Sequence, residues 1–173
     1  FGDPLTEGGN LPDRNDFTGY VPIMGRSDSG YLFINAENDT GGATVLDIDF
    51  DHSLKKWEIL KSESVDFSLV GGTTENCSGA ITPWNTVISC EEEKSPDNNG
   101  DGYNDYGWCI EIDPATKQII DHPGGLIGAD KLWALGNFRH ENVAIHQNQR
   151  TLYEGVDGSN GYLYKFVADN AQD

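Results

Sequence analysis

Short segments rich in β-branched and aromatic residues dominate this chain, and clusters of Gly, Asn, Asp and Pro separate them. Residues 45–50 (VLDIDF) alternate apolar with polar side chains, which is the period of a strand with one buried face. The separating clusters favour turns and cannot continue a strand or a helix. The sequence therefore predicts an all-β domain, in which only residues 129–135 favour a brief helix. The predicted strands cover residues 30–34, 43–50, 57–60, 86–89, 108–112, 117–120, 143–145 and 162–167.

A local unit recurs among these segments. Residues 47–52 (DIDFDH) resemble residues 111–116 (EIDPAT), and each stretch is followed by Lys and a second strand. Such hairpins are common in β-propellers, whose blades are four-stranded repeats of about 40 to 50 residues. We therefore expect residues 1–173 to form one partial β-propeller domain, with residues 1–15 as an irregular N-terminal segment. A very small complete propeller is the alternative.

The chain is strongly acidic, with 11 Lys and Arg against 29 Asp and Glu and a formal net charge of −18. Proteins bind nucleic acids through clustered cations, so we expect no nucleic-acid partner. No segment approaches the run of about 18 apolar residues that spans a membrane, so we expect no membrane span. The abundance of carboxylates, Asn, Gly and aromatics with a single Met favours an exported protein.

The chain contains three cysteines, Cys77, Cys90 and Cys109. An odd number cannot pair completely within one chain, and three cysteines do not form the framework of a small disulfide-rich protein. One bridge with a free thiol and thiolate ligation of a metal are both compatible with the sequence.

The densest polar segment covers residues 76–93 (NCSGAITPWNTVISCEEE). It places two sulfurs and three carboxylates at the ends of one short strand. Alternation sends Cys90 and Glu92 to one face and Glu91 and Glu93 to the other. Grouped carboxylates repel one another unless a cation compensates, so this segment indicates a metal site. A solvated acidic strand end is the alternative.

A second polar segment covers residues 137–142 (NFRHEN) and leads into an apolar strand. Arg139 supplies a cation for an anionic ligand, His140 a titratable imidazole and Glu141 a hard oxygen ligand. The alternative is a surface Arg–Glu pair at the start of a strand.

A third polar segment covers residues 97–105 (DNNGDGYND), with oxygen-bearing side chains at alternate positions and a Gly after Asp101. This spacing matches the first half of a calcium loop. Trp108 stands where an EF-hand has its last Glu, which excludes that sensor. We expect Asp97, Asn99 and Asp101 to bind a peripheral calcium ion; a plain polar hairpin loop is the alternative.

Taken together, these stretches resemble the PhoX-type alkaline phosphatase family. The motif in residues 76–92, which runs from Asn-Cys through Thr-Pro-Trp to Cys-Glu-Glu, is specific for the family. Residues 162–167 (YLYKFV) alone would be weak evidence. The matching segments follow the family's order and cover most of the chain between residues 16 and 167: residues 16–22, 32–37, 76–92, 106–114, 138–141 and 161–167.

The resemblance implies a six-bladed propeller with an iron pair and calcium ions at the mouth of its channel. It also implies hydrolysis of phosphate monoesters in the periplasm or outside the cell. Carried onto this sequence, it makes Cys77 the thiolate ligand and Glu92 and Glu141 carboxylate ligands of iron. Glu91 and Cys90 are further ligand candidates, Glu37 is a candidate for calcium, and Arg139 and His140 line the phosphate side as catalytic residues.

The chain also departs from the family. Residues 157–160 (DGSN) contain no Arg where members usually show one, and Asn85 stands where the family prefers Gly. Since members continue with further blades, we expect the remaining blades to lie on another segment or chain. One alternative is a catalytically inactive, calcium-stabilised propeller that acts as a structural or binding module. Another is a lactonase or phosphotriesterase on the same scaffold, which needs calcium but no thiolate.

Overall fold

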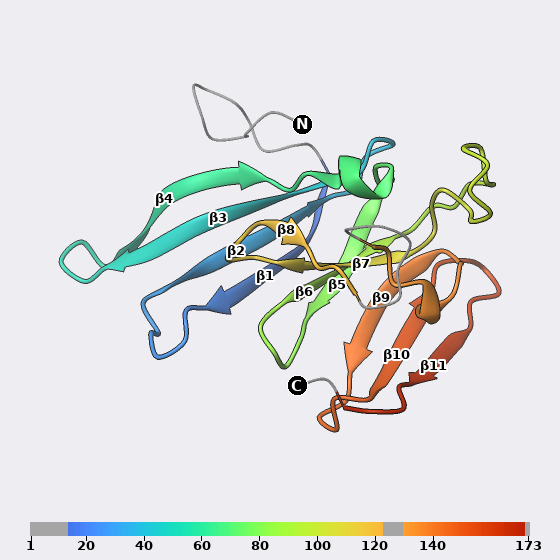
Figure 1. Cartoon of the computed structure of the whole chain (residues 1–173). Helices are drawn as coiled ribbons and strands as arrows, with labels where there is room; N and C mark the ends of the chain where they lie inside the picture. Colours follow the sequence, from blue (N-terminus) through green and yellow to red (C-terminus); the bar gives the residue numbers. More distant parts are fainter. Residues whose placement is uncertain (1–13, 123–129, 172–173) are drawn as a thin grey trace.

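The computed structural model describes residues 14–122 and 130–171, and these residues form three antiparallel sheets (Figure 1). The prediction of an all-β chain is confirmed. The helical turns in the described residues are short 3-10 segments, η1 (Phe67–Val70) and η2 (Trp133–Leu135). The predicted helix at residues 129–135 is thus a 3-10 turn, and its first residue lies outside the described part. None of the described helices is long and apolar enough to cross a membrane.

Each sheet is a meander in which consecutive strands pair. The first sheet contains β1 (Asn15–Pro22), β2 (Ser29–Ala36), β3 (Gly42–Asp51) and β4 (Lys56–Ser64). The second contains β5 (Asn76–Ile81), β6 (Val87–Glu91), β7 (Cys109–Asp113) and β8 (Gln118–Ile119). The third contains β9 (His140–Ile145), β10 (Thr151–Val156) and β11 (Leu163–Val167).

The repeated hairpin unit is present in the first two sheets, where it joins β3 to β4 and β7 to β8. Asp51 accepts hydrogen bonds from two backbone amides of its turn, at 2.7 and 2.9 Å. Asp113 accepts one at 2.8 Å in the equivalent turn. Lys55 (φ 53°) and Lys117 (φ 61°) occupy the same left-handed position. The two sheets are therefore structural repeats, as the sequence predicts.

The sheets pack through their first strands, since β1 contacts β5 and β5 contacts β9. One apolar core joins the first two sheets and includes Phe33 and Ile110. A second core includes Ile88 of β6 and Val143 of β9, and so joins the second sheet to the third. The described strands do not close into a ring. The packing brings the same end of all three first strands together.

The sequence patterns missed β1, β5 and β10. β5 contains Cys, Ser and Gly residues, which form strands poorly on their own. Its Gly79 is required by a close approach, because a Cβ atom there would overlap the carbonyl oxygen of Ile88 on β6. Residue 15, assigned to the irregular segment, begins β1; residues 1–13 lie outside the described part of the chain.

Candidate metal centre

The candidate ligands occupy equivalent positions in the three sheets. The second residue of each first strand is acidic or a thiol: Asp16 in β1, Cys77 in β5 and Glu141 in β9. The residue directly after each second strand is a carboxylate: Glu37 after β2, Glu92 after β6 and Asp157 after β10. The centre is therefore built from one structural unit used three times.

The backbone repeats the same connection in each sheet. The amides of Glu37, Glu92 and Asp157 donate hydrogen bonds of 2.9, 3.0 and 3.1 Å. Their acceptors are the carbonyl oxygens of the residues that precede the first strands, Arg14, Glu75 and Arg139. This bond ties the end of the second strand to the start of the first, so the two ligand positions of a sheet lie side by side.

The side chains from different sheets converge on Cys77, which is buried. The Cys77 sulfur and carboxylate oxygens of Glu92 and Glu141 all lie within 4.8 Å of one another. The sulfur also forms a group of this kind with Asp16 and Glu37. One thiol thus lies between two pairs of carboxylates. The structure brings together Cys77, Glu92 and Glu141, as the resemblance implies, and adds Glu37 on the other side of the sulfur.

The acidic groups at this centre repel one another when ionised, so their pKa values are raised. Burial raises the pKa of the Cys77 thiol far above its usual range, and the charges of Asp16 and Glu141 raise it further. Burial raises the pKa of Glu92 to about 7, with a further contribution from Asp157. Burial also raises the pKa of Glu141, as do the neighbouring charges of Asp157, Asp16 and Glu37.

No ion pair among the described residues compensates Asp16, Glu37, Glu92, Glu141 or Asp157. Bound cations would supply the missing positive charge and deprotonate the thiol. The donor set of one thiol and several carboxylates therefore fits a metal centre.

A buried polar network lies behind Cys77. The Ser89 hydroxyl on β6 donates to Asn35 Oδ1 at 2.8 Å and accepts from Asn76 Nδ2 at 2.9 Å. All three residues of this network are completely buried. Satisfied networks of this kind fix the positions of their members, so the network fixes the start of β5.

Glu91 lies apart from its neighbour Glu92. It is completely buried, and both of its oxygens accept from Lys131 Nζ, at 2.9 and 3.1 Å. The amides of Gly107 and Trp108 also donate to it, each at 3.0 Å. Because these partners saturate the carboxylate, we do not include Glu91 in the proposed ligand set.

The residues expected on the phosphate side lie in different environments. The Arg139 side chain is 46% exposed and pairs with Glu93. The ring of His140 is completely buried and faces Cys109 and Glu154. His140 therefore has no surface through which it could contact a substrate, and only Arg139 remains on that side.

The loop at residues 97–105 is exposed and folds onto its own backbone. Asp97 accepts hydrogen bonds from the amides of Gly100 and Gly102, at 2.6 and 3.0 Å. Asn99 and Asp101 each accept one at 2.9 Å from the amide two residues further on. Loop turns of this kind occur with and without an ion, so the calcium site stays a prediction.

Two residues of the centre were missed by sequence reasoning, Asp16 and Asp157. Asp16 lies in residues 16–22, which were matched to the family but not predicted as a strand, and no ligand role was assigned to it. Asp157 lies in residues 157–160, which the sequence comparison considered only for the absence of an Arg. The signal that could have found both is the repeat itself, since aligning the three sheets on Cys77 and Glu92 assigns each of them to a ligand position.

Comparisons with known proteins are consistent with this centre. The family model described as alkaline phosphatase PhoX matches residues 53–173. The structure is similar to that of Pseudomonas fluorescens PhoX in complex with vanadate, a transition state analogue, with a TM-score of 0.67 and 19% sequence identity. The match covers 95% of this chain and 43% of that chain, so this chain spans less than half the length of that relative. A comparison with curated proteins gave no match.

Proposed function

Because the chain belongs to the alkaline phosphatase PhoX family, we propose that it is part of a metal-dependent enzyme that hydrolyses phosphate monoesters. The observation that carries this proposal is the position of the Cys77 sulfur between two pairs of carboxylates. The solved relative holds vanadate, a transition state analogue, which supports phosphate-ester substrates for this chain as well.

We assign one cation to Cys77, Glu92 and Glu141 and a second to Cys77, Asp16 and Glu37. A thiolate combined with carboxylates suits iron, whereas sites made only of oxygen ligands suit calcium. The resemblance makes Glu37 a candidate for calcium as well, and Asp97, Asn99 and Asp101 remain the proposed peripheral calcium site. When bound, such cations neutralise charge on the phosphate oxygens.

The chain's own residues place the substrate. Arg139 lies two residues before the ligand Glu141, and its guanidinium is accessible once it leaves Glu93. Arginine binds phosphate oxygens through two parallel hydrogen bonds, so we assign phosphate binding to Arg139. The net charge of −18 would otherwise repel an anionic ester, and cations at the Cys77 centre would reverse the field there.

We infer that the three sheets are blades of a propeller whose other blades lie outside this chain. β11 leaves large apolar side chains uncovered, with Leu163 73% and Val167 50% exposed. Apolar surfaces of this kind are usually covered by a partner, and the solved relative is more than twice as long as this chain. We place the enzyme in the periplasm or outside the cell, on the basis of its composition.

A catalytically inactive, calcium-stabilised module is the second candidate. It is favoured by the absence of Arg from residues 157–160 and by the pairing of Arg139 with Glu93. In that case calcium removal would unfold the protein, and Cys77→Ala would change no measurable property.

The full-length protein tests the proposal through its metal content and its turnover of a phosphomonoester. We expect iron and calcium to copurify with it, and chelation to abolish turnover until both metals are returned. A well-folded full-length protein with no bound metal and no turnover would overturn the proposal.

A further inference from the structure

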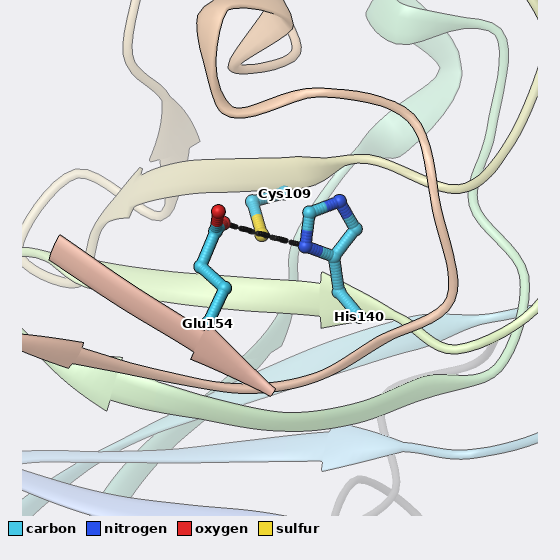
Figure 2. Close-up of side chains that lie close together, drawn as sticks. All are labelled: Cys109, His140 and Glu154. Atoms are coloured by element: carbon cyan, nitrogen blue, oxygen red, sulfur yellow. Dashed lines mark hydrogen bonds and ion pairs between the residues drawn. The ribbon is translucent and has the colours of Figure 1, made fainter. Parts of the chain in front are cut away.

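A second group of metal-ligating side chains lies between the second and third sheets, away from solvent. Figure 2 shows Cys109, His140 and Glu154 pointing toward one another from β7, β9 and β10. Cys109 and His140 have no exposed surface, and Glu154 is 1% exposed. Their ligand atoms all lie within 4.8 Å of one another.

The spacing of the three ligand atoms fits a tetrahedral ion. The Cys109 sulfur lies 3.4 Å from His140 Nδ1 and 3.8 Å from Glu154 Oε1, and these two atoms are 3.4 Å apart. Tetrahedral zinc with ordinary bond lengths places sulfur about 3.5 Å from nitrogen or oxygen, and nitrogen about 3.3 Å from oxygen. All three separations agree with these values to within about 0.3 Å.

The ring of His140 has the orientation of a metal ligand. Its Nε2 is 3.1 Å from the carbonyl oxygen of Gly136, to which it can only donate. In the neutral ring this leaves the lone pair on Nδ1, which faces Cys109 and Glu154. Phe138 stacks on the ring with 3.7 Å between centroids and fixes its plane. Metal-binding histidines typically donate their second nitrogen to a backbone carbonyl in this way.

The protein supplies too few partners for these polar groups. Glu154 Oε2 is buried and has no hydrogen-bond partner among the described residues. The Cys109 thiol carries one proton but has three close acceptors: His140 Nδ1, Glu154 Oε1 and the Cys90 sulfur at 3.6 Å. Around them pack apolar residues, among them Ile88, Val143 and Leu152. A buried carboxylate in such surroundings is costly unless a cation compensates it.

We propose that Cys109, His140 and Glu154 bind one divalent transition-metal ion of the zinc type, with Glu154 coordinating through both oxygens. Thiolate, imidazole and carboxylate are the ligands that zinc prefers, and a closed, buried site is typical of structural zinc. The ion links β7 to β9 and β10, so its role is to hold the second and third sheets together. The site is separate from the Cys77 centre and takes no part in the proposed hydrolysis.

Cobalt substitution tests this site without reference to activity. The full-length protein is unfolded with chelator and reductant, then refolded with Co²⁺, and the near-ultraviolet thiolate-to-cobalt absorption is recorded. The wild type should show this band and also the visible bands of a tetrahedral ion. The Cys77 thiol belongs to the other centre and can also bind cobalt, so the test is made without it: Cys77→Ser should keep the bands, and Cys77→Ser combined with Cys109→Ser should lose them. Glu154→Gln should weaken zinc binding by about tenfold or more.

Two results would overturn the proposal. One is a wild-type protein without zinc in which Cys90 and Cys109 form a disulfide; Cys90→Ser, which prevents this bridge, would then also bind no zinc. The other is a thiolate band that is lost in Cys77→Ser, or one that persists when Cys77→Ser is combined with Cys109→Ser. If the double variant fails to fold, retention of the band in Cys77→Ser still assigns the ion to the Cys109 group, and its loss still refutes that assignment.

Discussion

The side-chain amide of Asn35 donates a hydrogen bond of 2.7 Å to the backbone carbonyl of Cys77. Asn35 belongs to β2 of the first sheet and Cys77 to β5 of the second, and both residues are buried. The bond therefore fixes the backbone of the candidate thiolate relative to a neighbouring sheet. It shows that the geometry of the metal centre depends on how the sheets pack.

Replacing Asn35 by Leu should destabilise the protein and weaken metal binding at Cys77. The variant removes the side-chain donor to the Cys77 carbonyl and the acceptor of the Ser89 hydroxyl, and each unsatisfied buried group costs about 1–3 kcal/mol. Urea denaturation measures the change in the free energy of unfolding. Asn160→Ala, at an exposed position, should change it by less than about 0.5 kcal/mol. Equal effects of the two variants would contradict the role given to Asn35.

Glu141→Gln should lower the metal content strongly and the stability little. The amide keeps the shape of the side chain but removes a charged ligand, and in the metal-free protein it also relieves repulsion from Asp157 and Asp16. Elemental analysis and thermal denaturation measure the two effects. The matched control is Glu58→Gln, which alters an exposed surface pair with Lys56. Unchanged metal content in Glu141→Gln would refute its assignment as a ligand.

The metal-free protein should lose stability as the pH rises. The pKa of Glu92 is about 7 in the folded protein against 4.5 for the free side chain. Between these two pH values the folded state therefore binds more protons than the unfolded state. The stability that protonated Glu92 retains is fully present below pH 4.5 and is lost as the pH rises through about 7.

Urea titrations in chelator at pH 5 and pH 8 measure this effect. The midpoint should be lower at pH 8, and Glu92→Gln should reduce the difference. Added metal should restore stability at pH 8, because cations compensate the ionised carboxylates. A chelated protein that is equally stable at both values would contradict the electrostatic account.

Lys131→Met should destabilise the fold by about 3–5 kcal/mol, because it leaves the buried Glu91 carboxylate without its cation. Glu91 accepts from Lys131 at 2.9 and 3.1 Å, and Lys131 also donates to the Asp105 carbonyl at 2.8 Å. The double variant with Glu91→Gln should recover part of the loss. Chemical denaturation of the single and double variants measures the coupling. Additive effects would show that the pair acts independently.

Much of the fold followed from local patterns. Alternation in residues 45–50 predicts β3, and the repeated hairpin predicts the equivalence of the first two sheets. The first strand β5 was missed because it carries a ligand, Ser and Gly where most strands carry β-branched residues, whereas β1 contains Phe, Thr, Tyr and Val and its local pattern was not used. The strand conformation of β5 comes from its pairing with β6 and from the close approach at Gly79. Tertiary contacts thus override weak local preference at the positions that build the centre.

The candidate site was predictable in part. The resemblance assigned Cys77, Glu92, Glu141 and Glu37, and the structure brings these residues together around one sulfur. The different surroundings of Glu91 and Glu92 follow from alternation at the end of β6, but the buried partner Lys131 lies 40 residues away along the chain. The burial of His140 against Cys109 and Glu154 depends on the packing of β7 against β9 and β10, which no local pattern contains.

The central claim is that the Cys77 thiolate binds iron between two pairs of carboxylates. The most direct measurement is the thiolate-to-iron absorption of the full-length, iron-loaded protein and of its Cys77→Ser variant, with Cys90→Ser as the matched control. We predict a band in the wild type and in Cys90→Ser, and its loss in Cys77→Ser. An iron-loaded wild type without the band, or a band that persists in Cys77→Ser, would contradict the account.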